Sequence, residues 1–249
     1  MLHVRARLRS LLAPLTLRFT WHDQATTGYS SMRTHLQRDL EALTKKLLTV
    51  GSTVEQATAR ALTALMDRRL DLAEDVRARD SEVDQLEVEV EEECLKVLAL
   101  HAPVAADLRI VIAYLKLNND LERVGDLARN LAERAAFLAT REPIEIPEQI
   151  PVMGSYVRGM LRECLDAVVN ADTKLARKVL EDDEHVDQLH REVYGVIAQR
   201  IRQEPDRGEE LLQLLSVSRY LERMADQSTN VAEDVVFMVE GQVIRHQSA

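Results

Sequence analysis

The stretch LERVGDLARNLAE at residues 121–133 recurs one hundred residues later as LERMADQSTNVAE at residues 221–233. In each copy, apolar residues alternate at spacings of three and four, which is the pattern of a helix that packs along one face. Similarity at a fixed period indicates a duplicated structural unit. We therefore expect an all-α fold in which one helical unit occurs twice.

The duplication extends upstream of this stretch at an offset of 103 residues. The two copies are separated by TREPIEIPEQIP at residues 140–151, whose prolines restrict the backbone and predict an extended linker. The upstream matches are Gly51, Ser52, Val54, Asp80, Val83, Asp84, Gln85 and Leu86 in the first half, and Gly154, Ser155, Val157, Asp183, Val186, Asp187, Gln188 and Leu189 in the second. The chain thus divides into two equivalent halves.

Each half is expected to form three long helices that pack together, which gives a tandem repeat of two three-helix bundles. The expected segments are a leader over 1–31, the first bundle over 32–139, a linker over 140–151, the second bundle over 152–241 and a tail over 242–249. The expected helices are 32–68, 72–101 and 104–139 in the first bundle, and 152–170, 172–203 and 207–240 in the second.

Composition and charge narrow the class of protein. Aromatic residues make up only 4% of the chain against 30% charged residues, a balance typical of long helices rather than of β-sandwiches. Residues 1–31 carry four arginines and one aspartate, so that segment is +3 and the rest of the −10 chain is −13. An acidic body binds phosphate backbones poorly, so we expect no nucleic-acid partner.

The sequence also bears on location. No apolar run approaches the roughly 20 residues that span a bilayer, so we expect no transmembrane segment. Cys94 and Cys164 provide no disulfide framework, which fits a reduced cytoplasm. Residues 1–31 alternate Arg with Leu and precede Met32, where the first strongly patterned helix is expected to begin. We interpret them as a leader outside the working fold, with a basic amphipathic surface helix or a targeting segment as alternatives.

Acidic residues stand beside the packing seam of two helices in the first half. Residues equally far from the turn of an antiparallel hairpin lie at the same height. Asp84 and Glu122 both lie 19 residues from Pro103, and Asp80 and Asp126 both lie 23 residues from it. The spacing therefore predicts that these four carboxylates meet on one hairpin.

The second half repeats this arrangement independently. Asp187 and Glu222 are equidistant from the junction of residues 204–205, and so are Asp183 and Asp226. Four carboxylates at one height repel one another unless a cation neutralises them. Oxygen ligands of this kind suit divalent or iron-type ions such as Fe, Mn, Mg or Ca. The sequence thus predicts two metal sites.

The predicted metal-binding residues include an asparagine one turn beyond each acidic stripe, which can add an amide oxygen or orient water. They are Asp80, Asp84, Glu122, Asp126, Asn130, Asp183, Asp187, Glu222, Asp226 and Asn230. The alternative is a solvated acidic face that pairs with neighbouring arginines, with Arg123 and Arg223 as the competitors. His185 and His190 have no histidine counterparts in the first half, and we expect them to be surface residues rather than ligands.

The doubled LERxxD, the segment DLRIVIAYLKLNNDLERVGDLARN and the Gly-Ser of the first helix resemble the PhoU family of bacterial phosphate-signalling regulators. The resemblance runs from about Met32 to Gly241. It implies a cytoplasmic pair of three-helix bundles whose Glu/Asp-x-x-x-Asp motifs bind metal, in some members as multinuclear clusters. All eight acids of those motifs are present in this chain.

The resemblance also implies a function. Members of the family act as adaptors that repress the phosphate-starvation response and restrain phosphate uptake. The implied partners are the ATPase subunit of the phosphate ABC transporter and the phosphate-sensing histidine kinase, so that membrane association is peripheral. We therefore expect a metal-binding negative regulator of phosphate homeostasis that is not an enzyme.

Two other functions remain open. One is a carboxylate-bridged di-metal enzyme, although such bundles commonly use Glu-x-x-His pairs and none occurs in this chain. The other is a structural scaffold whose acids bind basic partner surfaces without metal. We also expect a homodimer, because long bundles expose extended faces.

Overall fold

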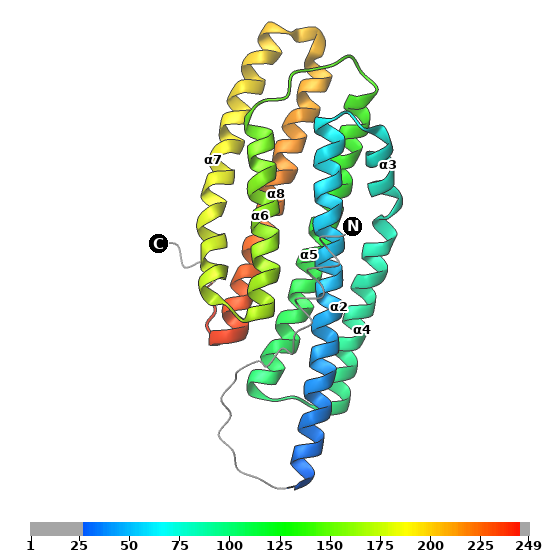
Figure 1. The fold of residues 1–249 in the computed structure, drawn as a ribbon. Coiled ribbons are helices and arrows are strands. Elements are labelled where there is room, and N and C mark those ends of the chain that lie inside the picture. The colour runs from blue at the N-terminus through cyan, green and yellow to red at the C-terminus, as the bar shows by residue number, and fades with distance from the viewer. Residues whose placement is uncertain (1–26, 245–249) are drawn as a thin grey trace.

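The computed structural model of the chain describes residues 27–244, and every regular element in that range is helical. The helices run nearly along one long axis (Figure 1). They are α2 (Thr27–Met66), α3 (Leu70–Ala78), α4 (Asp80–His101), α5 (Ala105–Ala139), α6 (Gln149–Asn170), α7 (Thr173–Gln203), η1 (Pro205–Arg207) and α8 (Gly208–Glu240). Among these helices, none is long and apolar enough to cross a membrane.

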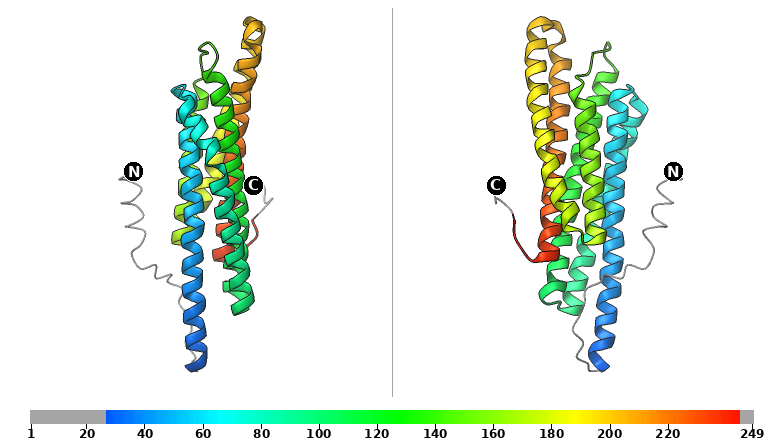
Figure 2. Two further views of the ribbon diagram at one scale, coloured as in Figure 1. Left: turned by 90° about the vertical axis from the view of Figure 1, so that its right-hand side faces the viewer. Right: turned by 60° about the vertical axis from the view of Figure 1, so that its left-hand side comes forward.

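The helices form two three-helix bundles that lie side by side (Figure 2). The first bundle contains α2, α5 and the broken helix α3–α4, and the second contains α6, α7 and α8. The α4–α5 turn and the α7–α8 turn lie at opposite ends of the molecule, so the two hairpins point in opposite directions (Figure 1). The predicted all-α tandem of three-helix bundles is confirmed.

One hydrophobic core runs through both bundles, which meet where α5 packs on α8 and α2 packs on α6. Leu121 of α5 and Leu221 of α8, the first residues of the repeated stretch, are 2% and 0% exposed. Lys116 Nζ on α5 lies 3.4 Å from Asp234 Oδ1 on α8, so a buried carboxylate is paired across the bundle interface. The two bundles therefore pack as a single unit.

The glycines of the repeated Gly-Ser pair lie at two points where α2 and α6 pack side by side. A Cβ added to Gly51 would overlap Cδ2 of Leu165, and a Cβ added to Gly154 would lie 2.9 Å from Cδ2 of Leu62. Leu62 and Leu165 are themselves related by the 103-residue offset of the repeat. Each bundle thus supplies a glycine that admits a leucine of the other, which explains why both halves carry a glycine at this position.

Gly51→Leu is expected to lower the free energy of unfolding by about 1–3 kcal/mol, because the added side chain overpacks the contact between α2 and α6. Gly159 of α6 is the matched control, since a Cβ built there would meet nothing within 4 Å. Gly159→Leu is expected to be neutral or to stabilise by up to about 1 kcal/mol, because leucine favours helix more than glycine does. Urea unfolding measures the stability of both variants. Equal unfolding midpoints would contradict the role of Gly51 in the contact between α2 and α6.

The observed elements differ from the predicted ones in three places. The helix predicted over 72–101 is interrupted at Arg79, whose φ of −96° and ψ of 2° leave the helical geometry. No proline or glycine marks this break, so breaker residues did not reveal it. The linker is shorter than 140–151, because α6 begins at Gln149 and accommodates Pro151 in its first turn.

The third difference concerns the start of the first helix. The helix α2 begins at Thr27 rather than at Met32, so it includes the end of the predicted leader. The rest of the leader, residues 1–26, and the tail residues 245–249 lie outside the described range.

Candidate metal centre

The first acidic cluster lies on the α4–α5 hairpin. Asp80 is the first residue of α4 and Asp84 follows one turn later, while Glu122 and Asp126 lie one turn apart on α5. Burial raises the pKa of Glu122, and the charges of Asp126 and Asp84 raise it further. Asp80 and Asp126 are joined by a shared partner, Arg129. The structure therefore places Glu122 near Asp84 and Asp126, and Arg129 connects Asp126 to Asp80.

The second cluster lies on the α7–α8 hairpin, where Asp183 and Asp187 belong to α7 and Glu222 and Asp226 to α8. Burial raises the pKa of Asp183 to about 7, and the other three acids of the cluster add to the shift. Burial also raises the pKa values of Glu222 and Asp226, to which the charge of Asp187 contributes. These four acids are thus close enough to repel one another.

The charges of Arg223 and Arg219 act on Glu222 of the second cluster, but one carboxylate oxygen of Asp183 lacks a donor. Oδ1 of Asp183 is buried and has no hydrogen-bond partner in the structure. A buried carboxylate oxygen without a donor is costly, and a cation would satisfy it. Carboxylate oxygens are also the ligands that hard cations prefer. The donor set of this cluster therefore fits a metal ion.

The side chains are not arranged as a finished metal cage. Within residues 27–244, no three or more His, Cys, Asp or Glu side chains converge in the geometry of a metal site. Rotation of the acidic side chains toward a common point would be needed for ligation. Metal binding at the two clusters therefore stays a prediction.

Arg129 makes the first cluster different from the second. Its Nη1 is ion-paired with Oδ2 of Asp80, and its Nη2 lies 2.9 Å from Oδ1 of Asp126. The i, i+3 spacing of Asp126 and Arg129 on one helix face was the signal for this contact.

The sequence suggested Arg123 and Arg223 as the competing cations. Arg123 Nη1 lies 3.9 Å from Oδ1 of Asp120, and its charge offsets part of the raised pKa of Glu122. Arg223 does the same for Glu222 and Asp226 in the second cluster.

A polar pair that was not predicted from the sequence lies about one helical turn closer to the connecting turn of each hairpin. Asn118 Nδ2 donates to the backbone oxygen of Glu87 at 2.9 Å in the first bundle. At the equivalent positions of the second bundle, Nδ1 of His190 lies 2.7 Å from Oγ of Ser218. His185 is exposed as predicted, whereas His190 is half-buried and its ring contacts Ser218. The first cluster thus has an extra carboxyl nearby where the second has an imidazole.

The two predicted asparagines occupy the other end of each cluster. Asn130 and Asn230 are half-buried and follow Asp126 and Asp226 by one helical turn, on α5 and α8 respectively. This position suits an amide oxygen that orients a ligand or a water molecule.

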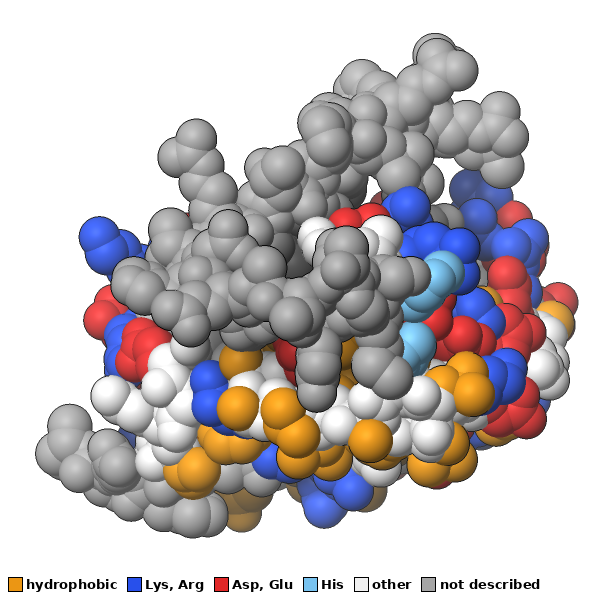
Figure 3. Space-filling view, turned by 90° about the horizontal axis from the view of Figure 1, so that it is seen from below, with side chains coloured by type: hydrophobic (Ala, Val, Ile, Leu, Met, Phe, Trp, Pro, Cys, Tyr) orange, Lys and Arg blue, Asp and Glu red, His pale blue; other side chains and the backbone are white. Residues whose placement is uncertain are grey.

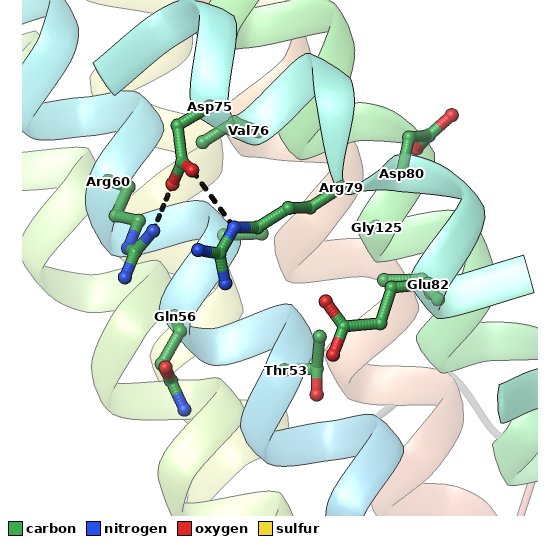
Figure 4. Close-up of a pocket in the computed structure, with 11 residues that line it drawn as sticks. Thr53, Gln56, Arg60, Asp75, Val76, Arg79, Asp80, Glu82 and Gly125 are labelled. Atoms are coloured by element: carbon green, nitrogen blue, oxygen red, sulfur yellow. Dashed lines mark hydrogen bonds and ion pairs between the residues drawn. The ribbon is translucent and has the colours of Figure 1, made fainter. Parts of the chain in front are cut away.

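An ion-paired triplet borders the first cluster. Arg60 Nη1 binds Oδ2 of Asp75, and Arg79 Nε lies 2.9 Å from Oδ1 of the same carboxylate (Figure 4). These residues and Asp80 line a pocket of about 190 Å³ beside the break between α3 and α4. The carboxylate of Asp80 points away from the two arginines (Figure 4). The triplet carries a formal charge of +1 next to the first cluster.

The second bundle carries the same triplet with the charges reversed. Lys178 Nζ lies 2.6 Å from Oε2 of Glu163 and 2.8 Å from Oδ2 of Asp182. These three residues stand 103 positions after their counterparts in the first bundle. The triplet therefore carries −1 next to the second cluster.

Two three-helix bundles in tandem, each with a carboxylate cluster on one hairpin, define a class of duplicated helical-bundle proteins. The PhoU domain family matches this chain twice, over residues 47–135 and 150–235. The chain belongs to the PhoU domain family, as the sequence resemblance implied.

Named relatives agree with this assignment. The chain is 34% identical over 212 residues to the phosphate-specific transport system accessory protein PhoU homolog of Aquifex aeolicus. The aligned region covers 85% of this chain and 96% of that protein. It is 35% identical over 211 residues to the homolog of the same name from Pseudomonas aeruginosa, with 84% and 86% covered.

Solved structures show the same fold. The crystal structure of PhoU from Pseudomonas aeruginosa superposes with a TM-score of 0.79 at 34% identity and covers 83% of this chain and 99% of that chain. The phosphate transport system regulatory protein PhoU from Streptococcus pneumoniae gives a TM-score of 0.75 at 28% identity, with 84% and 98% covered. The likeness therefore extends over both bundles.

Proposed function

We propose that this protein is a metal-binding negative regulator of phosphate homeostasis. It restrains phosphate uptake and the phosphate-starvation response by docking on the phosphate ABC transporter, through its ATPase subunit, and on the associated sensor histidine kinase. The match of both bundles to the PhoU family carries the proposal, since the relatives are named as accessory proteins of phosphate-specific transport. We place the protein in the cytoplasm, where it would meet the ATPase subunit and the kinase.

Metal ions are proposed to bind at the two carboxylate clusters. Asp183, Asp187, Glu222 and Asp226 would hold a cation in the second bundle, and their counterparts Asp80, Asp84, Glu122 and Asp126 would do so in the first. A bound cation supplies positive charge that joins the two helices of each hairpin. Oxygen ligands of this kind accept Fe, Mn, Mg or Ca, and elemental analysis of the purified protein identifies the ion.

Partner docking needs an accessible surface, and one end of the molecule offers apolar side chains. Leu100 and Val104, at the turn between α4 and α5, are 72% and 73% exposed. Viewed from below, hydrophobic side chains gather along one edge and charged side chains occupy another (Figure 3). This mixed surface supports association with another protein, and we include a homodimer in the proposal on the same ground.

A di-metal enzyme is the second candidate. The observation that favours it is the half-buried imidazole of His190, which follows Asp187 at the i, i+3 spacing that bundle di-metal sites use for Glu-x-x-His. The first bundle has Glu87 at the corresponding place, so the pattern is not duplicated. Substrate turnover by iron-loaded protein that is lost in Glu222→Gln would establish this function and replace the regulatory one.

Deletion of the gene is expected to make phosphate-starvation genes constitutively active in rich phosphate, because the proposed repressor is then missing. A transcriptional reporter for a starvation-induced promoter measures this effect. Complementation with the wild-type chain is expected to restore repression and serves as the control. Unchanged reporter activity in the deletion strain at high phosphate would contradict the proposed function.

A further inference from the structure

We propose that the two carboxylate clusters bind metal unequally, because Arg129 acts as a built-in competing cation in the first cluster. The second cluster then takes up metal at lower concentration than the first. This inference rests on the proposed metal binding and adds to it an order of filling and the residue that sets that order.

Arg129 bridges the two helices of the first hairpin through carboxylates that would otherwise be available to a metal ion. Its two terminal nitrogens contact one carboxylate from each helix, Asp80 from α4 and Asp126 from α5. Asp80 is 16% exposed and Arg129 35% exposed, so the pair is partly shielded from water. Charge-assisted contacts of this kind are stronger than neutral ones and must break before either carboxylate can ligate metal.

The second bundle has no arginine at the corresponding position. Thr229 stands one hundred residues after Arg129, and its Oγ1 donates to the backbone oxygen of Asp226 at 2.7 Å. The hydroxyl thus bonds to its own helix and carries no charge that would neutralise the cluster. Oδ1 of Asp183, the counterpart of Asp80, is buried without a hydrogen-bond partner. A cation therefore displaces nothing at this oxygen.

The charges of the ion-paired triplets also favour a cation at the second cluster over the first. The triplet of Arg60, Asp75 and Arg79 places +1 beside the first cluster, while the reversed triplet around Lys178 places −1 beside the second. Charges several ångströms away change the local potential that a cation meets. The triplets therefore favour a cation at the second cluster, whereas the charges of Arg219 and Arg223, which act on Glu222, oppose it.

Glu87 acts in the opposite direction, because it adds a carboxyl beside the first cluster where the second has His190. Its side chain is already engaged, with Oε1 accepting from Asn118 Nδ2 at 3.3 Å. The direct contacts of Arg129 outweigh this more distant charge, since Coulomb interactions fall with separation and with screening by water.

Titration of metal-free protein with Mn²⁺, followed by the electron paramagnetic resonance signal of free Mn²⁺, tests the inference. The wild-type chain is expected to show two classes of site that differ in affinity by about tenfold or more, as the loss of charge-assisted contacts implies. Asp226→Asn is expected to remove the tighter class and Asp126→Asn the weaker one. These two variants assign each class to its bundle.

Arg129→Thr gives the first cluster the residue that the second cluster has at the equivalent position. It is expected to lower the dissociation constant of the weaker class by about tenfold. Thr229→Arg makes the reciprocal change and is expected to weaken the tighter class to a similar extent. Arg69→Thr is the control, because it removes the same charge at the exposed pair of Arg69 with Asp71 at the start of α3. It is expected to leave both classes unchanged.

The outcomes separate this inference from the proposed function. Equal affinity of all sites in the wild-type chain would overturn the role of Arg129 while metal binding stands. An Arg129→Thr variant in which the affinity of the weaker class is unchanged would do the same. Absence of Mn²⁺ binding in the wild-type chain and in all variants would overturn the proposed metal sites and this inference together.

Discussion

Asp183→Asn is expected to stabilise the metal-free protein at pH 8 by about 1–2 kcal/mol, although the substitution removes a candidate metal ligand. Burial and three neighbouring carboxylates raise the pKa of Asp183 to about 7, so the charged form is unfavourable in the folded state. A shift of this size would correspond to about 4 kcal/mol for a fully buried group. The side chain is only partly buried, and solvent screening reduces the effect.

The sign of the pH dependence follows from the raised pKa of Asp183. Between its ordinary value of 3.8 and about 7, the folded state binds a proton that the unfolded state has released. The stability that this proton contributes is complete below that range and is lost as the pH rises through it. The metal-free wild-type chain should therefore lose stability over this range, and Asp183→Asn should lose less.

Urea unfolding in the presence of a chelator measures this difference at several pH values. Glu181→Gln is the control, because it removes an exposed carboxylate from the same helix two residues away and is expected to have little effect. An Asp183→Asn variant that is less stable than the wild-type chain at pH 8 would show that the carboxylate is not under repulsion.

Saturation with Mn²⁺ is expected to raise the free energy of unfolding of the wild-type chain by about 3 kcal/mol for each site at a hundredfold excess over the dissociation constant. The reason is that the ion binds the assembled hairpins and not the unfolded chain. Asp126→Asn combined with Asp226→Asn removes one carboxylate from each cluster. This double variant is expected to lose most of the metal-induced stabilisation while remaining folded without metal.

The matched control for the double variant is Glu89→Gln combined with Glu192→Gln. These residues occupy equivalent positions on α4 and α7, and they lie outside the two clusters. The control removes the same number of negative charges and is expected to keep the full response to Mn²⁺. Equal responses of the two double variants would assign the stabilisation to general charge neutralisation rather than to the clusters.

The heights of the acids were predictable from the sequence because a helix rises by a constant 1.5 Å per residue. Counting residues outward from each turn was therefore enough to pair Asp84 with Glu122 on the first hairpin. The same regularity holds on the second hairpin, and the break at Arg79 does not disturb it because Asp80 and Asp84 both belong to α4. The break itself was not predictable, because neither glycine nor proline accompanies it.

The differences between the two clusters were harder to predict, because a duplicated unit is recognised by the residues that its two copies share. Arg129 and Thr229 differ, and so do Glu87 and His190, so none of them stood out as a repeated feature. Their roles depend on where long side chains turn, and the contact of Arg129 with Asp80 joins residues on different helices. Side-chain direction of this kind comes from three-dimensional packing rather than from spacing along the chain.

The repeated Gly-Ser pair illustrates the converse case. Its repetition was visible in the sequence, but its reason was not, because Gly51 and Gly154 contact leucines of the opposite bundle. A contact between halves that are 103 residues apart leaves no local signature. The pair therefore indicated duplication without showing that the bundles interlock.

The central claim is that the two carboxylate clusters hold metal, and the metal content of the purified protein tests it most directly. Untagged wild-type chain and the Asp126→Asn, Asp226→Asn double variant are purified identically and analysed for Fe, Mn, Mg and Ca by elemental mass spectrometry. We predict that the wild-type chain carries at least one of these ions in near-stoichiometric amount and that the double variant carries little or none. Equal metal content in the two proteins, or none in either, would contradict the claim.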